Sequence, residues 1–102
     1  MDRRTLWIYT DNYKRAKFIK FEIKRLMLKS NFKNKTISNE RRLLAKFLLS
    51  RVPRISSGTF INNICINSGR SHGIDKHTKF SRFRFRTSAY NSLLPGFTRA
   101  NW

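Results

Sequence analysis

The sequence has few acidic residues, few residues that break regular structure and almost no cysteine. Its 102 residues include 5 Asp and Glu, 1 Cys, 2 Pro and 4 Gly. A single cysteine cannot form a disulfide within the chain, which fits a reducing compartment. No apolar stretch approaches the roughly 18 residues that a membrane-spanning helix needs, and the first residues lack the apolar region and cleavage site of a secretory signal. These absences exclude a disulfide-stapled fold and a membrane-spanning one.

Positive charge is abundant instead. The chain has 23 Lys and Arg against 5 Asp and Glu, a formal net charge of +18 at pH 7. A compact globule of this size would repel itself, so we expect a polyanionic partner. Nucleic acid is the leading candidate because each neutralised phosphate releases a condensed counterion. An acidic membrane surface is the alternative.

The apolar residues predict little independent core. They make up 39% of the chain, and many lie in separate short runs rather than in one convergent set. Small domains bury a modest fraction of their surface and are marginally stable even when well patterned. We therefore expect the chain to have little core of its own.

A first helix is predicted from Asp11 to about Ser30, with Asp11 or Asn12 as its N-cap. Its apolar face consists of Ala16, Ile19, Ile23, Leu26 and Met27. Lys and Arg cover the rest of the helix, and Phe18, Phe21 and Leu28 lie in the middle of that basic face. Either these three are ordinary exposed apolar residues, or protein covers one face of the helix and RNA the other.

A second helix is predicted over residues 39–51, with Ser38 or Asn39 as its N-cap and Glu40 in the first turn. Its apolar stripe, Leu43, Leu44, Phe47 and Leu48, is expected to be buried. We expect the two helices to pack as an αα-hairpin. Pro53 ends the second helix because a proline disfavours helical geometry in the preceding residue, Val52.

Residues 53–80 are loop-like, with turn signals at Ser56-Ser57-Gly58 and at Ser68-Gly69-Arg70. Three isoleucines, Ile61, Ile64 and Ile66, could form a small β-hairpin across Gly69. Beyond the loop, residues 82–86 (RFRFR) alternate with the period of a strand. Phe85, Ala89 and Leu93 keep helical spacing as well, so the local pattern allows either a strand or a short helix that ends before Pro95.

Two segments carry a resemblance to a known family: residues 52–74 (VPRISSGTFINNICINSGRSHGI) and residues 80–102 (FSRFRFRTSAYNSLLPGFTRANW). The first is similar to a Leu-Pro-Arg-Asn-Ser-Ser loop followed by Asn-Arg-Cys and Thr-Gly-Arg-Pro-Arg-Gly stretches. The second is similar to a Ser-Arg-x-x-Phe-Arg run and a Leu-Pro-Gly-x-x-Lys-Ala-Ser-Trp terminus. In this order and spacing they resemble the universal small-subunit ribosomal protein fourteen, in the form that has lost its zinc. The chain departs from the pattern at Ile55, Ser71-His72, Thr87, Asn101 and Ser92, where the family usually has glycine.

Zinc-binding members of this family carry two Cys-x-x-Cys pairs, because four thiolates around one metal can hold together a segment too small for its own core. The matching positions here are Cys65, Ser68, Ser81 and Arg84, with two, twelve and two residues between them. Serine is a poor zinc ligand and arginine cannot serve, so no structural zinc is predicted at this degenerate site. A rebuilt site of Cys65, His72 and His77 is the alternative; otherwise Cys65 is a small buried residue and the histidines face RNA or solvent.

A catalytic interpretation of the same residues fails. A Cys/His nucleophile pair needs an orienting third group and a pocket that excludes water. This segment is short and basic, and Asp75 is its one nearby carboxylate. We therefore expect neither enzyme activity nor a cofactor.

The resemblance implies binding to ribosomal RNA by charge, loop backbone and aromatic contact. The residues expected to make these contacts are Arg51, Arg54, Ser56, Ser57, Gly69, Arg70, Lys79, Ser81, Arg82, Arg84, Arg86, Arg99 and Trp102. Arginine suits this task because its planar fork can hold two phosphate oxygens while its face stacks on a base. Phe83, Phe85, Tyr90 and Phe97 could stack on bases or form a small core, and core is favoured for most of them.

The expected fold is mainly α with irregular segments. Residues 1–52 form an N-terminal helical arm with the αα-hairpin, and residues 53–102 form an RNA-binding segment. That segment contains an extended loop with a small β-hairpin, a degenerate zinc-ribbon-like knuckle and a short C-terminal helix. A DNA-binding nucleoid protein or a membrane-active amphipathic peptide remains the alternative.

The resemblance also implies a place in the head of the small ribosomal subunit, on the 3′ major domain of its rRNA. Ribosomal proteins three, ten and nineteen of that subunit would be neighbours, and neither a membrane nor a second copy of the chain is expected as a partner. Richness in Phe, Ile, Asn and Lys, the residues of AT-rich codons, suggests a mitochondrial ribosome. A plastid or an AT-rich bacterium would look similar.

Overall fold

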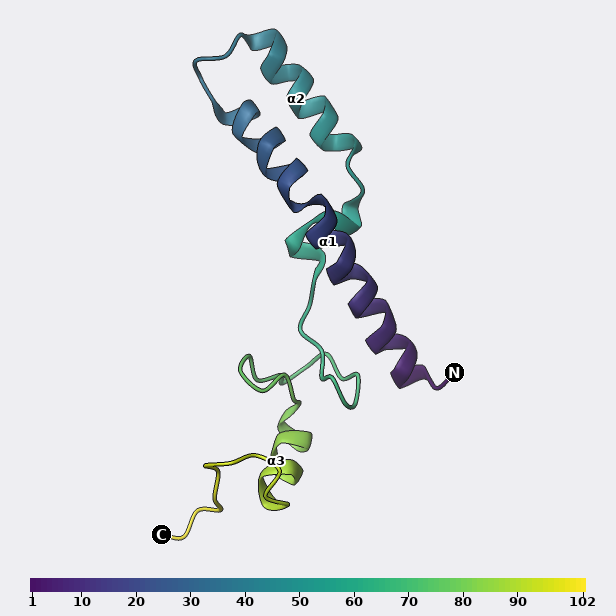
Figure 1. The fold of residues 1–102 in the computed structure, drawn as a ribbon, viewed down its shortest axis with the longest axis vertical. Coiled ribbons are helices and arrows are strands. Elements are labelled where there is room, and N and C mark those ends of the chain that lie inside the picture. The colour runs from purple at the N-terminus through teal and green to yellow at the C-terminus, as the bar shows by residue number, and fades with distance from the viewer. The chain divides into compact units, whose positions relative to one another are not determined.

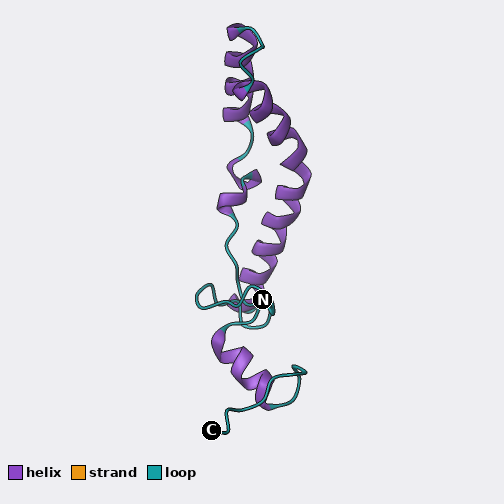
Figure 2. Ribbon diagram, turned by 90° about the vertical axis from the view of Figure 1, so that its left-hand side faces the viewer, coloured by secondary structure: helices purple, strands orange, loops and turns teal.

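The computed structural model describes all 102 residues and is mainly helical, as predicted, with no β-strand (Figure 2). The helices are α1 (Arg3–Lys33), α2 (Asn39–Arg51) and α3 (Arg82–Tyr90), and two short 3-10 turns, η1 (Arg54–Ser56) and η2 (Gly58–Phe60), follow α2 (Figure 1). No helix combines the length and apolarity needed to cross a membrane.

The contacts within the chain divide it into two compact units. Residues 12–61 form the helical unit, and residues 1–11 together with residues 62–102 form the turn unit. Helix α1 therefore contributes its first residues to one unit and the rest to the other. The predicted division after residue 52 concerns which part binds protein and which binds RNA, and it stays a prediction.

Helix α1 begins at Arg3, well before the predicted start at Asp11. Asp2 ends the non-helical stretch: its carbonyl oxygen accepts a hydrogen bond from the Leu6 N–H at 3.1 Å and another from Thr5 Oγ1 at 2.6 Å. Asp11 is a residue of the helix interior and not its cap. Its small polar side chain resembled a cap signal, but such a side chain is also tolerated on an exposed helix surface.

The face of α1 that packs within the helical unit is the opposite of the one predicted. Ile19, Ile23, Leu26 and Met27 are all at least half exposed. The partly buried apolar residues are instead Phe18, Phe21, Leu28 and Phe32.

The loop that carries η1 and η2 covers this second face. A Cβ placed on Gly58 would lie 3.2 Å from the Phe18 ring, so the loop backbone passes close to that side chain. The guanidinium of Arg25 donates a hydrogen bond to Ser56 Oγ at 3.2 Å, and Lys14 Nζ lies 4.8 Å from the centre of the Phe60 ring. These contacts partly bury the side of α1 that the sequence presented as its basic face.

Helix α2 runs back along the C-terminal part of α1 (Figure 1). The contact between them lies near the connecting loop, where Arg42 Nε donates to the Phe32 carbonyl at 3.1 Å and Ala45 is buried. The expected burial of Leu43, Leu44, Phe47 and Leu48 was wrong, because all four side chains are exposed. Helix α2 thus lies beside α1 without burying its apolar stripe.

The predicted end points of α2 are confirmed. The helix ends at Arg51, and Val52 has the extended backbone (φ −66°, ψ 136°) that a following proline favours. Ser38 stands at the N-cap but makes no side-chain capping bond.

No β-hairpin forms across Gly69. The chain closes there in a tight turn, in which the Cys65 N–H donates to the Arg70 carbonyl at 2.8 Å and the Gly69 N–H to the Cys65 carbonyl at 2.9 Å. Ile66 hydrogen-bonds to Lys79, and a single antiparallel bridge joins Ile74 and Ser81. The isoleucines supplied strand propensity, but the turn uses the backbone groups that a ladder would need.

The alternating residues 82–86 are helical, so the helix interpretation is confirmed and the strand interpretation is wrong. Phe85 packs edge-on against Phe97 with ring centres 5.0 Å apart, which holds the following segment against α3. The helix ends in a Schellman motif, with Ser92 N–H bound to Ala89 and Leu93 N–H to Ser88. Ser92 adopts φ 56° there, a backbone conformation that favours glycine.

Candidate nucleic-acid interface

The site is organised by the turn between Cys65 and Arg70. Cys65 is completely buried, and its Sγ accepts a hydrogen bond from the Ser68 N–H at 3.4 Å. Burial by itself would raise the pKa of this thiol. The Ser68 hydroxyl and the N–H groups of Ser68, Ser81 and Asn67 favour the thiolate and lower the pKa to about 6.

Gly69 lets this turn lie against the first turns of α1. A Cβ at this position would lie 3.1 Å from the Arg4 carbonyl oxygen and 3.4 Å from Trp7 Cε3. Gly69 is buried and has φ 71°, so both its backbone conformation and its surroundings exclude a side chain. This close approach brings Arg4 beside the residues of the turn.

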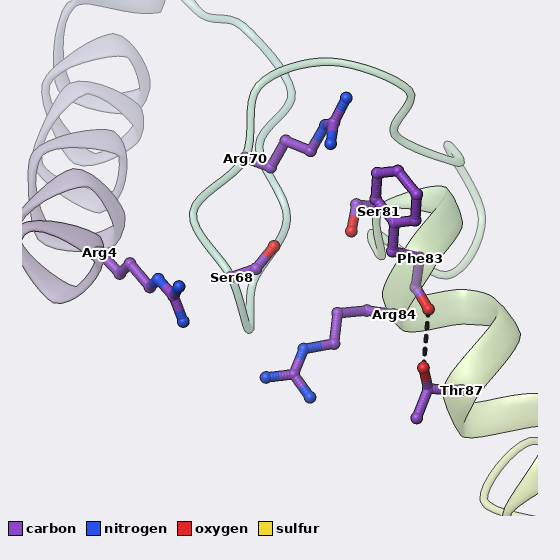
Figure 3. A pocket seen from close by; sticks show the side chains of 7 residues that line it. All are labelled: Arg4, Ser68, Arg70, Ser81, Phe83, Arg84 and Thr87. Carbon is purple, nitrogen blue, oxygen red and sulfur yellow. Dashed lines mark hydrogen bonds between the residues drawn. The ribbon is translucent and has the colours of Figure 1, made fainter.

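A pocket of about 400 Å³ opens between the turn, the start of α1 and the start of α3. Its lining residues are Arg4, Ser68, Arg70, Ser81, Phe83, Arg84 and Thr87 (Figure 3). Arg4 and Arg84 reach toward each other from opposite sides, and the Ser68 and Ser81 side chains lie above them in this view. Three of the predicted RNA-binding residues, Arg70, Ser81 and Arg84, are thereby brought together.

The pocket is electropositive. Its lining includes three arginines and no carboxylate. The Ser68 hydroxyl oxygen is buried and makes no hydrogen bond of regular geometry, although it lies close enough to the Cys65 thiol to affect its pKa. Ser81 stands at the N-cap of α3 without a side-chain capping bond.

The N-terminus of α3 adds open donors to this pocket. The Arg82 N–H binds the Gly73 carbonyl and the Phe85 N–H binds the Ser81 carbonyl, whereas the N–H groups of Phe83 and Arg84 have no backbone acceptor. The first turn of a helix also carries the positive end of its dipole. The arrangement can therefore attract and hydrogen-bond an anion.

The four positions matched to a zinc site do not suit a metal cation. They supply one thiol, two hydroxyls and the guanidinium of Arg84, and Arg4 and Arg70 line the same pocket. The chain has no cluster of three His, Cys, Asp or Glu side chains that could hold a metal. His72 and His77 therefore do not form such a cluster with Cys65. The prediction that no structural zinc binds here stays a prediction.

Aromatic rings hold several arginines in place. The guanidinium carbons of Arg70 and Arg82 lie 4.7 and 4.8 Å from the centre of the Phe83 ring. With 23 cationic side chains and 5 acidic ones, most cations cannot pair with a carboxylate. A guanidinium that lies over a ring uses its face there, and its in-plane N–H groups stay available for phosphate oxygens where they make no other bond. Arg70 Nε already donates to the His72 carbonyl at 3.2 Å, which leaves its terminal N–H groups.

Tyr90 organises a second pair of arginines. Arg86 Nε donates to the Tyr90 hydroxyl at 3.2 Å, and the guanidinium of Arg99 lies 5.3 Å from the ring centre. The hydrogen bond from Arg86 and the positive charges of both arginines lower the pKa of Tyr90. Arg99 and Arg86 are thus close together although they are separated by the Pro95-Gly96 turn.

Lys79 lies in a turn that Asp75 stabilises. Asp75 Oδ2 accepts hydrogen bonds from the Thr78 N–H at 3.0 Å and the Thr78 hydroxyl at 2.9 Å, which lower the pKa of Asp75. Lys79 itself is exposed and has φ 59°. Its side chain is therefore accessible to a partner, and its contact with RNA stays a prediction.

The other predicted contacts belong to the helical unit. Arg51 lies over the Phe47 ring and Arg54 over the Phe60 ring, both exposed to solvent. Ser57 shares a hydrogen bond with Thr59. Ser56 differs, because it is fully buried and its hydroxyl is engaged by Arg25 and the Pro53 carbonyl. Its position indicates a structural role, and an RNA contact by Ser56 stays a prediction.

Trp102 is fully exposed. Arg4 and Thr87, by contrast, line the pocket but were missed by the sequence analysis. No pattern could have identified Arg4, because more than sixty positions separate it from the turn that it meets. Thr87 follows Arg84 by one helical turn, so the helix interpretation of this segment could have placed the two side chains on one face.

Comparison with known proteins gives a consistent result. Residues 48–101 match the family described as Ribosomal protein S14p/S29e. The small ribosomal subunit protein uS14c of Helicosporidium sp. subsp. Simulium jonesii is 41% identical over 83 residues, which cover 81% of this chain and 82% of that protein. The uS14 of Orientia tsutsugamushi (strain Ikeda) is 38% identical over 92 residues, 89% of this chain and 91% of that protein.

A mitochondrial relative is also found. The small ribosomal subunit protein uS14m of Prototheca wickerhamii is 32% identical over 95 residues, covering 93% of this chain and 96% of that protein. The family match includes the Cys65–Arg70 turn and α3, the elements that form the arginine pocket with the start of α1. The chain therefore belongs to the ribosomal protein S14p/S29e family.

Proposed function

We propose that this protein binds and stabilises the 3′ major, or head, domain of small-subunit rRNA and thereby supports assembly of the subunit. As a member of a ribosomal protein family it is a structural constituent of the small subunit and not an enzyme. The observation that supports head-domain RNA as the ligand is the arginine pocket in the segment that the family match covers. An excess of positive charge allows phosphate strands to approach one another at such a site.

The two units would divide this task. In the turn unit, the exposed arginines that stack on Phe83 and Tyr90 would meet the rRNA, and Trp102 would pack against a partner. In the helical unit, the exposed apolar side chains of α1 and α2 would face protein. The neighbours that we propose there are ribosomal proteins three, ten and nineteen of the small subunit, and not a second copy of this chain.

We further infer that the Cys65–Arg70 turn is a metal-free counterpart of a zinc knuckle. Its backbone hydrogen bonds and the buried Cys65 hold it closed, with hydroxyls at two of the positions that would supply thiolates. The test is a metal assay of the purified protein by mass spectrometry. We expect no zinc, and one zinc per chain would overturn the inference.

The compartment that we propose is the mitochondrion. A mitochondrial relative and the abundance of residues with AT-rich codons support this, and the plastid and bacterial relatives are the alternatives. Fractionation of the source cells with an antibody to the chain would decide it. Detection in plastids or in a bacterial cytoplasm would overturn the mitochondrial assignment.

Crosslinking with readout of the bound RNA positions tests the function itself. We expect the chain to sediment with small subunits through a sucrose gradient at moderate salt, and its crosslinks to map to the 3′ major domain. Crosslinks confined to another rRNA domain would exclude head binding. Recovery of a stable folded monomer at the top of the gradient would exclude the ribosomal role.

A further inference from the structure

We propose that the pocket between the Cys65–Arg70 turn and the first turns of α1 and α3 binds one backbone phosphate of the RNA. This inference rests on the proposed function, because it takes RNA as the ligand and adds the chemical group and the residues that hold it. The pocket occupies the positions at which the sequence resemblance suggested a degenerate metal site. The predicted ligand is thus an anion where a metal site would hold a cation.

The charge of the lining is the first argument. Arg4 and Arg84 converge on the pocket from different helices, and Arg70 lines it as well (Figure 3). No carboxylate lines the pocket to neutralise them. The one hydrogen bond drawn among the lining residues joins Thr87 Oγ1 to the Phe83 carbonyl, so neither Arg4 nor Arg84 uses its donors within this group. Two guanidinium groups held near each other without an anion repel, and a phosphate between them removes that repulsion.

The uncharged donors are the second and independent argument. The Ser81 hydroxyl makes no capping bond to α3. The N–H groups of Phe83 and Arg84 at the helix N-terminus are also without a backbone acceptor. A backbone phosphate has several acceptor oxygens and no donor of its own, so it matches a pocket whose polar groups are mostly donors.

The geometry favours a backbone phosphate over a base. Phe83 is the one aromatic residue of the lining and already has Arg70 and Arg82 near its ring, whereas most other lining residues carry guanidinium or hydroxyl groups, which hydrogen-bond to phosphate oxygens. Arg4 belongs to α1 and Arg84 to α3. A phosphate between them would therefore also join the two segments of the turn unit, residues 1–11 and residues 62–102. RNA binding and ordering of this unit would then be the same event.

Phosphate-ethylation interference tests the proposal. A head-domain rRNA fragment, ethylated at random phosphates, is partitioned by binding to the wild-type protein and to Arg4→Gln and Arg84→Gln variants. Arg3→Gln and Lys76→Gln remove the same charge from exposed neighbours outside the pocket and serve as controls. We expect one phosphate whose ethylation weakens wild-type and control binding but no longer affects the two pocket variants.

Affinity and salt dependence provide a second measurement. Each pocket variant should bind the fragment about tenfold more weakly and lower the salt slope by about 1. The double variant should lose less than the sum of the two single losses, because both arginines hold the same group. Arg84→Lys, which keeps the charge without the planar fork, should recover part of the loss.

Protection of Cys65 from iodoacetamide in each complex reports that the turn has folded, since this thiol is buried. A folded Arg84→Gln complex with an unchanged interference pattern would overturn the phosphate site, and so would equal losses in Arg84→Gln and Lys76→Gln. Failure of the wild-type chain to prefer head-domain RNA would instead overturn the proposed function. The two results are therefore distinguishable.

Discussion

The helical unit and the turn unit differ in their secondary structure and in how many residues they bury. The helical unit is regular in secondary structure, yet Ala45 and Ser56 are its only buried residues and most apolar side chains of α2 face solvent. The turn unit is mostly irregular, yet it buries Cys65, Gly69, Ser81 and Ser88. A helix satisfies its backbone hydrogen bonds internally, so it depends less on individual buried groups than an irregular segment does, which needs specific buried groups and turns. The helical unit should therefore tolerate substitutions that the turn unit does not.

The largest expected effect is that of Gly69→Ala in the turn unit. The new Cβ would lie 3.1 Å from the Arg4 carbonyl at φ 71°, so we expect the turn to lose its contact with α1, at a cost of about 2 kcal/mol or more. The measurement is protection of Cys65 from iodoacetamide in the RNA complex. Gly96→Ala is the matched control, because Gly96 has φ 83° but nothing within 4 Å. Equal loss of protection in both variants would show that the close approach to Arg4 is unimportant.

The second prediction concerns pH and the Cys65 thiol. Its folded-state pKa of about 6 is below the ordinary value of 9.0, so its contribution to stability is complete above the unfolded pKa and is lost as pH falls through about 6. In the RNA complex, we expect the protection factors of the turn unit, which are corrected for the intrinsic rise of amide exchange with pH, to be larger at pH 8 than at pH 6. Cys65→Ser should remove this difference, since a hydroxyl does not ionise in that range. A pH dependence that persists in Cys65→Ser would assign it to another group.

Ser56→Ala tests the contact between α1 and the loop of residues 53–61 in the helical unit. It removes the hydrogen bonds of the Ser56 hydroxyl with Arg25 and the Pro53 carbonyl, at a cost of about 1–2 kcal/mol. Hydrogen exchange should increase in residues 53–61, while the interiors of α1 and α2 keep their protection. Ser57→Ala is the control, because the Ser57 hydroxyl bonds only Thr59 at the surface. Loss of helix protection as well would contradict the independence of the helices from buried contacts.

Ser92→Gly should stabilise the turn unit. Ser92 is the C′ residue of the Schellman motif at φ 56°, and glycine relieves the strain of that conformation. The greater chain entropy of glycine offsets part of the gain, so we expect a net stabilisation of about 0.5 kcal/mol. Amide exchange at the end of α3 would measure it. A faster exchange than in the wild type would show that Ser92 is not strained.

The smallest expected effect on stability is that of Leu44→Gln in α2. Leu44 is 58% exposed, so its replacement should change the stability of the complex with RNA by less than about 0.5 kcal/mol. Leu49→Gln, on the partly buried side of the same helix, should cost more. If the apolar side of α2 meets another head protein, Leu44→Gln should still reduce incorporation into subunits. Unchanged incorporation would argue against that protein-facing role.

Local chemistry explains which predictions succeeded. Both end points of α2 follow from residues close to its ends, such as Glu40 in its first turn and Pro53 after its last. The start of α1 was misplaced because Asp2 and Asp11 offer similar capping signals, and only the backbone bonds to Asp2 distinguish them. The family resemblance rested on residues adjacent in the chain, and the family match confirms it.

The amino-acid sequence alone was enough to establish the positive charge, the mainly helical character and the family, because these depend on composition and on neighbours along the chain. Which faces of α1 and α2 are buried, and that Arg4 joins Arg70 and Arg84 at one pocket, depended on the folded chain. A helix with apolar residues on two faces has two possible packings. The choice between them is made by the loop around Ser56 and Gly58. Residues distant in sequence meet only when a turn such as that at Gly69 brings their backbones together.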